Sequence, residues 1–249
     1  MSEKQRYFIE LSYNGTNYHG WQSQPNANTV QAELDKALTT ILREPIETTG
    51  CGRTDTGVHA TEFFAHFDIS KSEIEIPKSE MSINAILPKD IAIKRIIPVH
   101  ADAHARFDAR LRSYEYHIHF EKDPFKLNRS WELRDKPDIA LMNAAAKIMM
   151  EYIDFSCFSK SNTQTFTNNC KIARAEWVEG ESGLIFHISA DRFLRNMVRA
   201  IVGTLILVGR KEMEPDSIRT IIESKNRSNA GTSVPACGLY LTEVIYAYL

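Results

Sequence analysis

The sequence predicts an α+β protein built from two similar α/β halves with antiparallel or mixed sheets. Strand-like and helix-like patterns are mixed along the whole chain, and the order strand, helix, strands, helix, strand occurs loosely twice. The 249 residues suffice for two ordinary domains. We therefore expect domains at 1–105 and 106–249, joined near 100–110 without a Gly/Ser-rich linker and separated by a cleft.

The first half opens with alternating residues over 6–12, which predict a strand, and "NGTNYHG" then supplies turn residues. Asn28 or Thr29 can cap a helix whose apolar residues recur at helical spacing until Pro45. The rest of this half is expected to contain strands and one short helix from Pro77 to Leu87, the strands lying at 46–53, 62–69 and 91–99.

The second half opens with "LRSYEYHIHF" at 111–120, where the even positions, Tyr114 and Tyr116 among them, fall on one face of a strand. A helix is expected at 138–150, followed by strands at 170–179 and 183–190. An apolar helix at about 194–208, a short helix after Pro215 and a last strand at 239–248 complete this half. Three arginines would lie along one flank of the apolar helix at 194–208, namely Arg192, Arg195 and Arg199.

Composition excludes several classes of protein. No apolar run is long enough to cross a bilayer, and the charged beginning "MSEKQRYFIE" lacks the features of a secretory signal, so we expect a cytoplasmic protein without membrane contact. A net charge of −2 argues against an evenly basic surface but leaves room for local arginine clusters. The four cysteines are widely scattered, which predicts reduced thiols and no zinc site.

The stretch "TTGCGRTDTGVHA" at 48–60 surrounds one carboxylate with glycines and a basic residue. If 51–55 is extended, Arg53 and Asp55 share a face, and the guanidinium would hold the carboxylate ionised. An ionised carboxylate suits a nucleophile or the stabilisation of positive charge. An ordinary ion pair in a glycine-rich turn has the same spacing, so the residues alone leave both interpretations open.

Other chemistries fit this stretch less well. "DTG" occurs in aspartic proteases, but these need two carboxylates that share a proton, and no second "DTG" or "DSG" is present. The apolar strand and second aspartate of an aspartyl-phosphate phosphatase are missing as well. His100 and His104 have helical spacing, but no cluster of further ligands completes a metal site.

Eight motifs occur in order along nearly the whole chain: "YNGTNYHGWQSQPNANTVQAEL" at 13–34, "GRTDTGVHA" at 52–60, "HFD" at 66–68, "LPKDIAI" at 87–93, "HARFDARLRSYEYHI" at 104–118, "DFSCF" at 154–158, "FLRNMVRAIVGTLILVG" at 193–209 and "PACGLYLTEVIY" at 235–246. Together they resemble the TruA family of tRNA pseudouridine synthases. The resemblance implies an isomerase that converts uridine to pseudouridine at positions 38, 39 and 40 of the tRNA anticodon stem-loop. It also implies a homodimer that uses no metal or organic cofactor and binds RNA in its central cleft.

By position, the resemblance makes Asp55 the essential aspartate and Arg199 the arginine paired with it. Tyr114 matches a tyrosine that packs against the target base, Leu239 an apolar residue of the pocket, and Arg53 an arginine that helps to flip the nucleotide. Arginines expected to contact RNA are Arg106, Arg112, Arg192 and Arg195.

The chemistry suits these residue types. A carboxylate can attack the sugar, attack the base or remove a sugar proton, and each route needs Asp55 charged and shielded from water. Without the resemblance, a solvated helix face would explain the arginines, and a tyrosine such as Tyr114 is usually core. The rival from another class is a non-catalytic RNA-binding or chaperone module on the same scaffold.

The chain departs from the usual family pattern at a few positions, which bear on the choice of uridines and on tRNA affinity. They are Thr56, Glu62, Phe63 and Ser113, together with part of "AGTSVPACGLYL".

Overall fold

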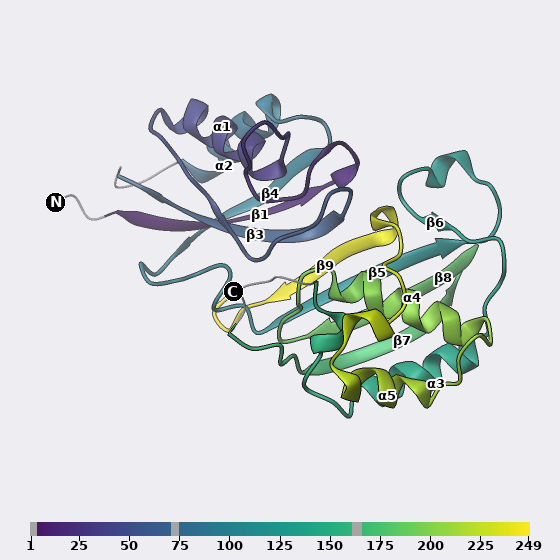
Figure 1. Cartoon of the computed structure of the whole chain (residues 1–249). Helices are drawn as coiled ribbons and strands as arrows, with labels where there is room; N and C mark the ends of the chain where they lie inside the picture. Colours follow the sequence, from purple (N-terminus) through teal and green to yellow (C-terminus); the bar gives the residue numbers. More distant parts are fainter. Residues whose placement is uncertain (1–3, 71–74, 161–165) are drawn as a thin grey trace. The chain divides into compact units, whose positions relative to one another are not determined.

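A computed structural model describes residues 4–70, 75–160 and 166–249. The chain forms two compact units, one made of the residues up to Arg110 together with Leu241–Leu249 and one of Leu111–Tyr240 (Figure 1). The boundary lies five residues beyond the one expected from sequence, and the last nine residues return to the first unit. The expectation that 1–105 and 106–249 act as domains remains a prediction.

The first unit is an antiparallel sheet built around β1 (Gln5–Tyr13). β1 pairs antiparallel with β3 (His59–Ile69) on one side and with β4 (Ile91–Val99) on the other. The short β2 (Thr49–Gly50) pairs with β3, and the strand order continues from β3 to β9 (Leu239–Ile245). β1 and β4 confirm the predicted strands, whereas 46–53 is a strand only over two residues.

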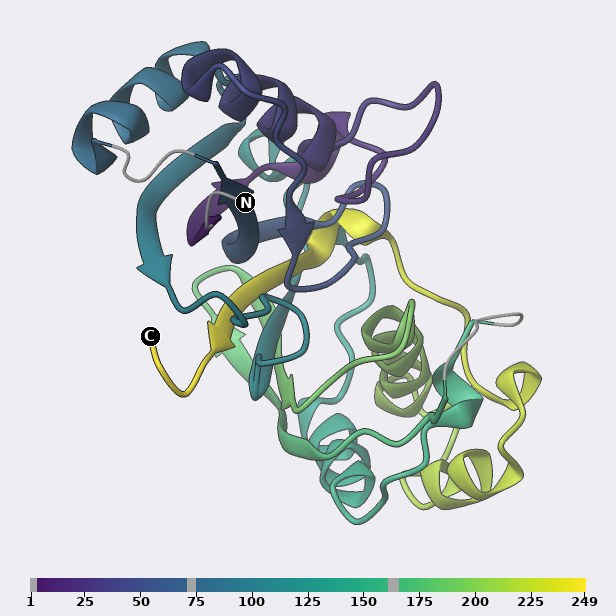
Figure 2. The same ribbon diagram turned by 90° about the vertical axis from the view of Figure 1, so that its left-hand side faces the viewer.

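Two helices, α1 (Val30–Leu42) and α2 (Ile76–Ile86), lie side by side against this sheet, as Figures 1 and 2 show. Thr29 caps α1 as predicted, because its hydroxyl accepts a hydrogen bond from the amide of Ala32 at 3.4 Å. The helix ends at Arg43, whose backbone is left-handed. The apolar stripe of α1 is buried at Val30, Leu34 and Leu38.

Asp35 of α1 gives the first unit a pH dependence that can be measured. Its Oδ1 accepts hydrogen bonds from the amide of Thr48 at 3.0 Å and from the Thr48 hydroxyl at 2.6 Å. Burial raises the pKa of Asp35 to about 6, although the hydrogen bonds from Thr48 act in the opposite direction. A carboxyl that binds its proton more tightly when folded stabilises the fold at low pH, and this contribution is lost between about pH 4 and pH 6.

We expect Asp35→Asn to keep both hydrogen bonds through its amide oxygen while removing the buried charge. Its free energy of unfolding should vary less than that of the wild type between pH 4 and 6, and at pH 8 it should be higher by about 1 to 2 kcal/mol. Urea unfolding at several pH values measures the difference. Parallel pH profiles for the two proteins would contradict the assignment.

The second unit is an antiparallel sheet in the order β5 (Leu111–His119), β8 (Gly183–Ala190) and β7 (Ile172–Gly180). A short strand, β6 (Trp131–Glu132), pairs with β5 in parallel. Three helices cover one face of this sheet in Figure 1, and they are α3 (Ile139–Met149), α4 (Met197–Gly209) and α5 (Ser217–Ser224). Helices and strands of both units confirm the predicted α+β class with two α/β halves.

The apolar helix α4 begins three residues later than predicted. Asn196 precedes it with φ of 66°, a left-handed conformation that an α-helix does not accommodate. Arg192 and Arg195 therefore lie in the segment before the helix, and only Arg199 is on it. The predicted flank of three arginines on one helix is wrong for this reason.

All four cysteines are free, in agreement with the sequence prediction, and three of them are buried. Burial raises the pKa of the Cys157 and Cys170 thiols to about 12, so both stay protonated at neutral pH.

Candidate active site

Asp55 stands at the first position of a tight turn. The amide of Val58 donates to the carbonyl of Asp55 at 3.1 Å, and Gly57, the third residue of the turn, has φ of 80°. This conformation strains any residue with a side chain, which explains the glycine after Thr56. The structure has no strand between β2 and β3, so Asp55 is presented by a turn before β3 and not by an extended segment over 51–55.

The segment from Asn14 to Trp21, here called the anchor loop, packs along this turn. Its backbone contacts the turn segment at three points: the Trp21 amide donates to the Thr54 carbonyl at 3.4 Å, the Gly57 amide donates to the Tyr18 carbonyl at 3.3 Å, and the Gly15 amide donates to Nδ1 of His59 at 3.1 Å. The hydroxyls of Tyr13 and Thr54 add a fourth bond of 2.9 Å just before the loop. The backbone on both sides of Asp55 is thereby fixed.

Two glycines let the anchor loop approach this closely. A Cβ at Gly15 would overlap the carbonyl oxygen of Val58, and a Cβ at Gly20 would overlap that of Thr54. Gly20 also has φ of 85°, so both its conformation and its surroundings require glycine.

Trp21 is buried at the end of the anchor loop. Its ring stacks on Phe63 with centroids 4.1 Å apart. A Cβ at Gly50 would overlap its indole nitrogen, so the glycine makes room for the ring. These contacts fix Trp21, the last residue of the anchor loop, against β2 and β3. Phe63 is buried in this stack, so this departure from the family pattern is a packing change.

The structure also shows the surroundings of the other residues that depart from the family pattern. The carboxylate of Glu62 accepts the amide of Val244 at 2.7 Å, and burial raises the pKa of Glu62. The hydroxyl of Ser189 donates to that of Ser113 at 2.8 Å. Thr56 is exposed at the second position of the Asp55 turn.

Arg53 does not form the ion pair with Asp55 that the spacing predicted. Its side chain is exposed and, within the described part of the chain, has neither a hydrogen bond nor an ion pair. The physical reason is the backbone, because 51–55 is not a strand and period-two geometry does not apply.

In the second unit, Arg199 is held by the segment from Ala230 to Gly238, here called the strap. Nε of Arg199 donates to the Val234 carbonyl at 2.8 Å, and the Val234 amide donates to the Arg199 carbonyl at 3.3 Å. Gly203 lets the strap lie close to α4, since a Cβ at this position would overlap the carbonyl oxygen of Thr232. Arg227 fixes its beginning through the carbonyls of Ala230 and Gly231.

The strap also reaches the aromatic face of β5. The Tyr116 hydroxyl donates to the Pro235 carbonyl at 2.8 Å. Gly238 packs so closely on the Tyr116 ring that a Cβ at this position would overlap it. Leu239 follows as the first, buried residue of β9. Tyr114 lies two residues before Tyr116 on the same face and meets Phe193 edge to face, with centroids 5.2 Å apart. In the second unit the strap therefore contacts Arg199 and Tyr116 and leads into Leu239, while Tyr114 lies on the same face of β5 as Tyr116.

The four arginines expected to contact RNA have different surroundings. Arg106 is exposed, with its guanidinium carbon 5.7 Å from the centre of the Phe107 ring. Arg112 donates to the carbonyl of Asp191 at 3.0 Å. Arg192 and Arg195 lie between β8 and α4, where the Lys160 amide donates to the Arg195 carbonyl at 3.3 Å.

The histidines at 100 and 104 have structural contacts. Nδ1 of His104 accepts the amides of Arg106 and Phe107 at 3.1 and 3.3 Å, and the His100 ring packs on Tyr248. Burial lowers the pKa of His104, which favours the neutral ring that these bonds require. Over 4–70, 75–160 and 166–249 no group of three or more His, Cys, Asp or Glu side chains could hold a metal ion.

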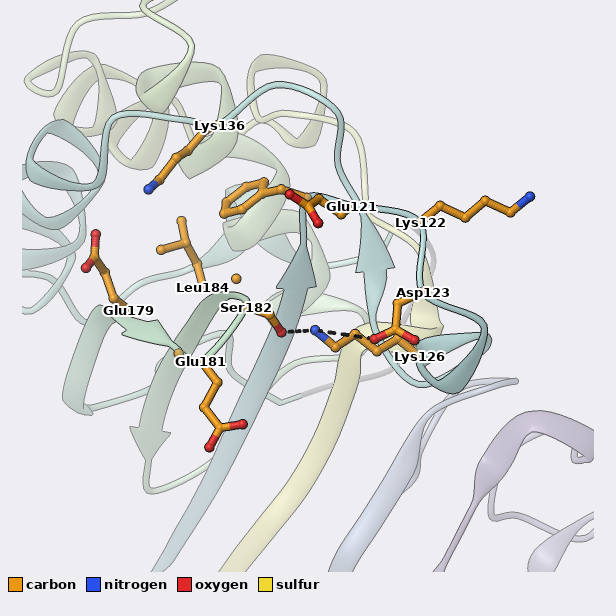
Figure 3. Close-up of a pocket in the computed structure, with 12 residues that line it drawn as sticks. Glu121, Lys122, Asp123, Lys126, Lys136, Glu179, Glu181, Ser182 and Leu184 are labelled. Atoms are coloured by element: carbon orange, nitrogen blue, oxygen red, sulfur yellow. Dashed lines mark hydrogen bonds and ion pairs between the residues drawn. The ribbon is translucent and has the colours of Figure 1, made fainter.

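A cavity of about 540 Å³ lies elsewhere in the second unit, beside the hairpin of β7 and β8 (Figure 3). None of the predicted site residues lines it. Phe120, on its wall, lies six residues along the chain from Tyr114, a distance of about 20 Å in extended chain. Its lining includes three lysines and four carboxylates, a balance that does not favour an RNA phosphate. We therefore do not assign the active site to this cavity.

No helix in the described ranges is long and apolar enough to cross a membrane. A family model described as tRNA pseudouridine synthase matches residues 11–108 and 152–247. Three relatives, each named tRNA pseudouridine synthase A, come from Parabacteroides distasonis, Bacteroides fragilis and Porphyromonas gingivalis. They are 48%, 49% and 50% identical to this chain, covering 97% of it in each case and 96%, 96% and 97% of their own lengths.

The α+β fold and these matches define an isomerase of the pseudouridine synthase class. More specifically, the chain belongs to the tRNA pseudouridine synthase family, and the resemblance drawn from its motifs is confirmed. Its function is tRNA pseudouridylation.

Proposed function

We propose that this enzyme isomerises uridine to pseudouridine at positions 38, 39 and 40 of the tRNA anticodon stem-loop, with Asp55 as its catalytic carboxylate. The observation that supports this most is the fixed turn of Asp55. The anchor loop holds it through two backbone hydrogen bonds, a third bond from the Gly15 amide to the His59 ring, and two glycine contacts. A catalytic group must be held within a fraction of an ångström of its reactive position, and such a turn meets that need.

The reaction explains why a carboxylate is needed. The bond between C1′ and N1 breaks, the uracil rotates, and C5 bonds to C1′ while the hydrogen on C5 leaves as a proton and N1 gains one. Atoms and electrons balance without an oxidant or a second substrate. Asp55 would attack C1′, attack C6 or remove a proton from the sugar, and each route uses the ionised form.

The other proposed residues hold the nucleotide. A base inside a stem must leave the stack before it can react, which suits an exposed arginine such as Arg53 for displacing it. Tyr114 would then pack against the uracil and Leu239 would line its pocket. We propose that Arg199 pairs with Asp55 in a cleft between the domains 1–105 and 106–249, which brings the two groups of residues to one nucleotide.

Local positive charge would bind the phosphates around that nucleotide. Arg106, Arg112, Arg192 and Arg195 are the proposed contacts, and a net charge of −2 is compatible with them because only the RNA-facing surface must be basic. By its resemblance to the family, we further propose that the enzyme acts in the cytoplasm as a homodimer. Analytical ultracentrifugation measures the second point directly.

The target positions can be tested on tRNA transcripts in which uridines 38, 39 and 40 are replaced by cytidine one at a time and all together. We expect pseudouridine mapping to show loss of modification only at the replaced position, and no modification in the triple variant. Modification that persists in the triple variant would place the target elsewhere in tRNA.

A further inference from the structure

The first half of the anchor loop, which holds the Asp55 turn on one side, bonds on its other side to Asp90. The second half is held by backbone hydrogen bonds that join His19, Gly20 and Trp21 to Asn28, Val30 and Gln31. The Asp90 carbonyl accepts the amide of Asn14 at 2.9 Å. Its carboxylate accepts the Tyr18 hydroxyl at 2.5 Å and the side-chain amide of Asn17 at 3.2 Å. Asp90 stands directly before β4, and the first residue of β4, Ile91, pairs with Tyr13 at the end of β1. The sheet therefore places Asp90 beside the start of the loop.

The bond between Tyr18 and Asp90 is of a strong kind. Hydroxyl donors to a carboxylate reach lengths of about 2.5 to 2.7 Å when the bond is charge-assisted. Only 2% of Tyr18 is exposed, so its hydroxyl loses water on folding and needs this partner. Burial and the hydrogen bond to Asp90 raise the pKa of Tyr18, which keeps the hydroxyl protonated and donating.

Tyr18 connects this bond to the catalytic turn. Its side chain is held by Asp90, while its own carbonyl accepts the amide of Gly57 at 3.3 Å. Gly57 lies two residues after Asp55 and gives the turn its shape. A displacement of Tyr18 would therefore shift the backbone that carries the Asp55 carboxylate.

We propose that Tyr18 and Asp90 are positioning residues for the isomerisation: their hydrogen bond sets the anchor loop, and the loop sets the position of Asp55. This inference rests on the proposed function, in which Asp55 is the catalytic carboxylate. Neither residue needs to touch the nucleotide. Both carboxylate oxygens of Asp90 bond to the anchor loop, so its side chain serves the loop and not the strand that follows.

The test compares rate and affinity in variants that remove this bond. Tyr18→Phe and Asp90→Ala, which remove the donor and the acceptor of this bond, are assayed in a single turnover at saturating tRNA labelled with tritium at uridine C5. We expect each rate to fall between about 10-fold and 100-fold, because small displacements of a catalytic group have effects of this size. The Kd for tRNA should stay within about threefold, since the phosphate contacts are unchanged.

A matched control separates positioning from general stability. Tyr152→Phe also removes a hydrogen bond from a tyrosine hydroxyl to a carboxylate, that of Glu223 at 2.9 Å, but in the second unit. Its rate should equal that of the wild type. The double variant of Tyr18 and Asp90 should be no slower than the slower single variant, because the two residues act as one unit. A purely structural role would lower the melting temperature without changing the rate of the folded enzyme.

The outcomes distinguish this inference from the proposed function. If Tyr18→Phe and Asp90→Ala react within twofold of the wild type while Asp55→Asn is inactive, the positioning inference is wrong and the catalytic assignment stands. If Asp55→Asn reacts normally, the catalytic assignment itself fails. Tyr18→Phe and Asp90→Ala each remove the same hydrogen bond, so if one variant does not fold, the other carries the test, and an unchanged rate in it overturns the inference.

Discussion

Asp55→Asn should abolish the release of tritium from tRNA labelled at uridine C5 while leaving tRNA binding nearly intact. The substitution keeps the size of the side chain and removes the charge that every route to pseudouridine uses. Loss of a central catalytic group lowers turnover by about 10⁴-fold or more. Binding should persist because contacts to phosphates supply most of the affinity for RNA, and Asp55 makes none of the proposed ones.

The control for this experiment is Asp135→Asn, which makes the same chemical change at an exposed position whose nearest cation, on Arg210, is 3.9 Å away. It should release tritium at the wild-type rate. Equal melting temperatures of the Asp55 variant and the wild type would show that the fold is intact. Turnover of Asp55→Asn close to that of the wild type would show that another group performs the chemistry, and a wild type that binds tRNA without releasing tritium would favour the non-catalytic RNA-binding module.

Gly203→Ala should have the second large effect, on both stability and activity. Alanine in place of glycine inside a helix normally stabilises it by about 1 kcal/mol. Here the new methyl group would overlap the Thr232 carbonyl, and forcing an extra carbon into a packed site costs about 1 to 3 kcal/mol. The contact is with backbone, which yields less than the end of a flexible side chain, so the cost should exceed the helix gain.

The same substitution should lower activity, because the strap carries the carbonyl that holds Arg199 and leads into Leu239. We expect a loss of about 1 to 2 kcal/mol in urea unfolding and at least about a tenfold loss of turnover. Gly180→Ala is the matched control in the same unit, since its Cβ would meet Ile185 at an ordinary 3.5 Å. A Gly203→Ala enzyme as stable as the wild type would show that the strap moves freely.

The sequence predicts the elements well where one periodic pattern runs without interruption. The strand at 91–99 matches β4 residue for residue, and the cap at Thr29 begins α1 where expected. Such patterns depend on local geometry and on which face is buried, and both can be read from one chain.

The prediction of helix and strand boundaries fails where the backbone conformation of a single residue sets the boundary. Asn196 ends the possible helix on its N-terminal side through its left-handed φ, so the arginines before it leave the helix flank. Asparagine tolerates this conformation without requiring it, and the sequence therefore does not reveal it. The pairing of Arg53 with Asp55, which required 51–55 to be extended, is absent for a similar reason: these residues form no strand and lead into the turn at Gly57.

The sequence did not reveal the residues that hold the Asp55 turn in place, for a different reason. Asp90 lies 35 residues from Asp55 along the chain and acts through Tyr18, and neither has a distinctive spacing. The motifs "YNGTNYHGWQ" and "LPKDIAI" contain both residues, but only the sheet pairing of β1 with β4 shows that they meet. Contacts between distant segments follow from topology, which periodicity within one segment does not contain.

Asp55 should react with a nucleotide drawn out of the tRNA stem while Arg199 pairs with its carboxylate. The most direct measurement is a crystal structure of the enzyme with a tRNA whose target uridine is replaced by 5-fluorouridine. We expect the flipped nucleotide within about 3.5 Å of the Asp55 carboxylate, with Arg199 beside that carboxylate and the Tyr114 ring against the base. A target nucleotide bound away from Asp55 would contradict it.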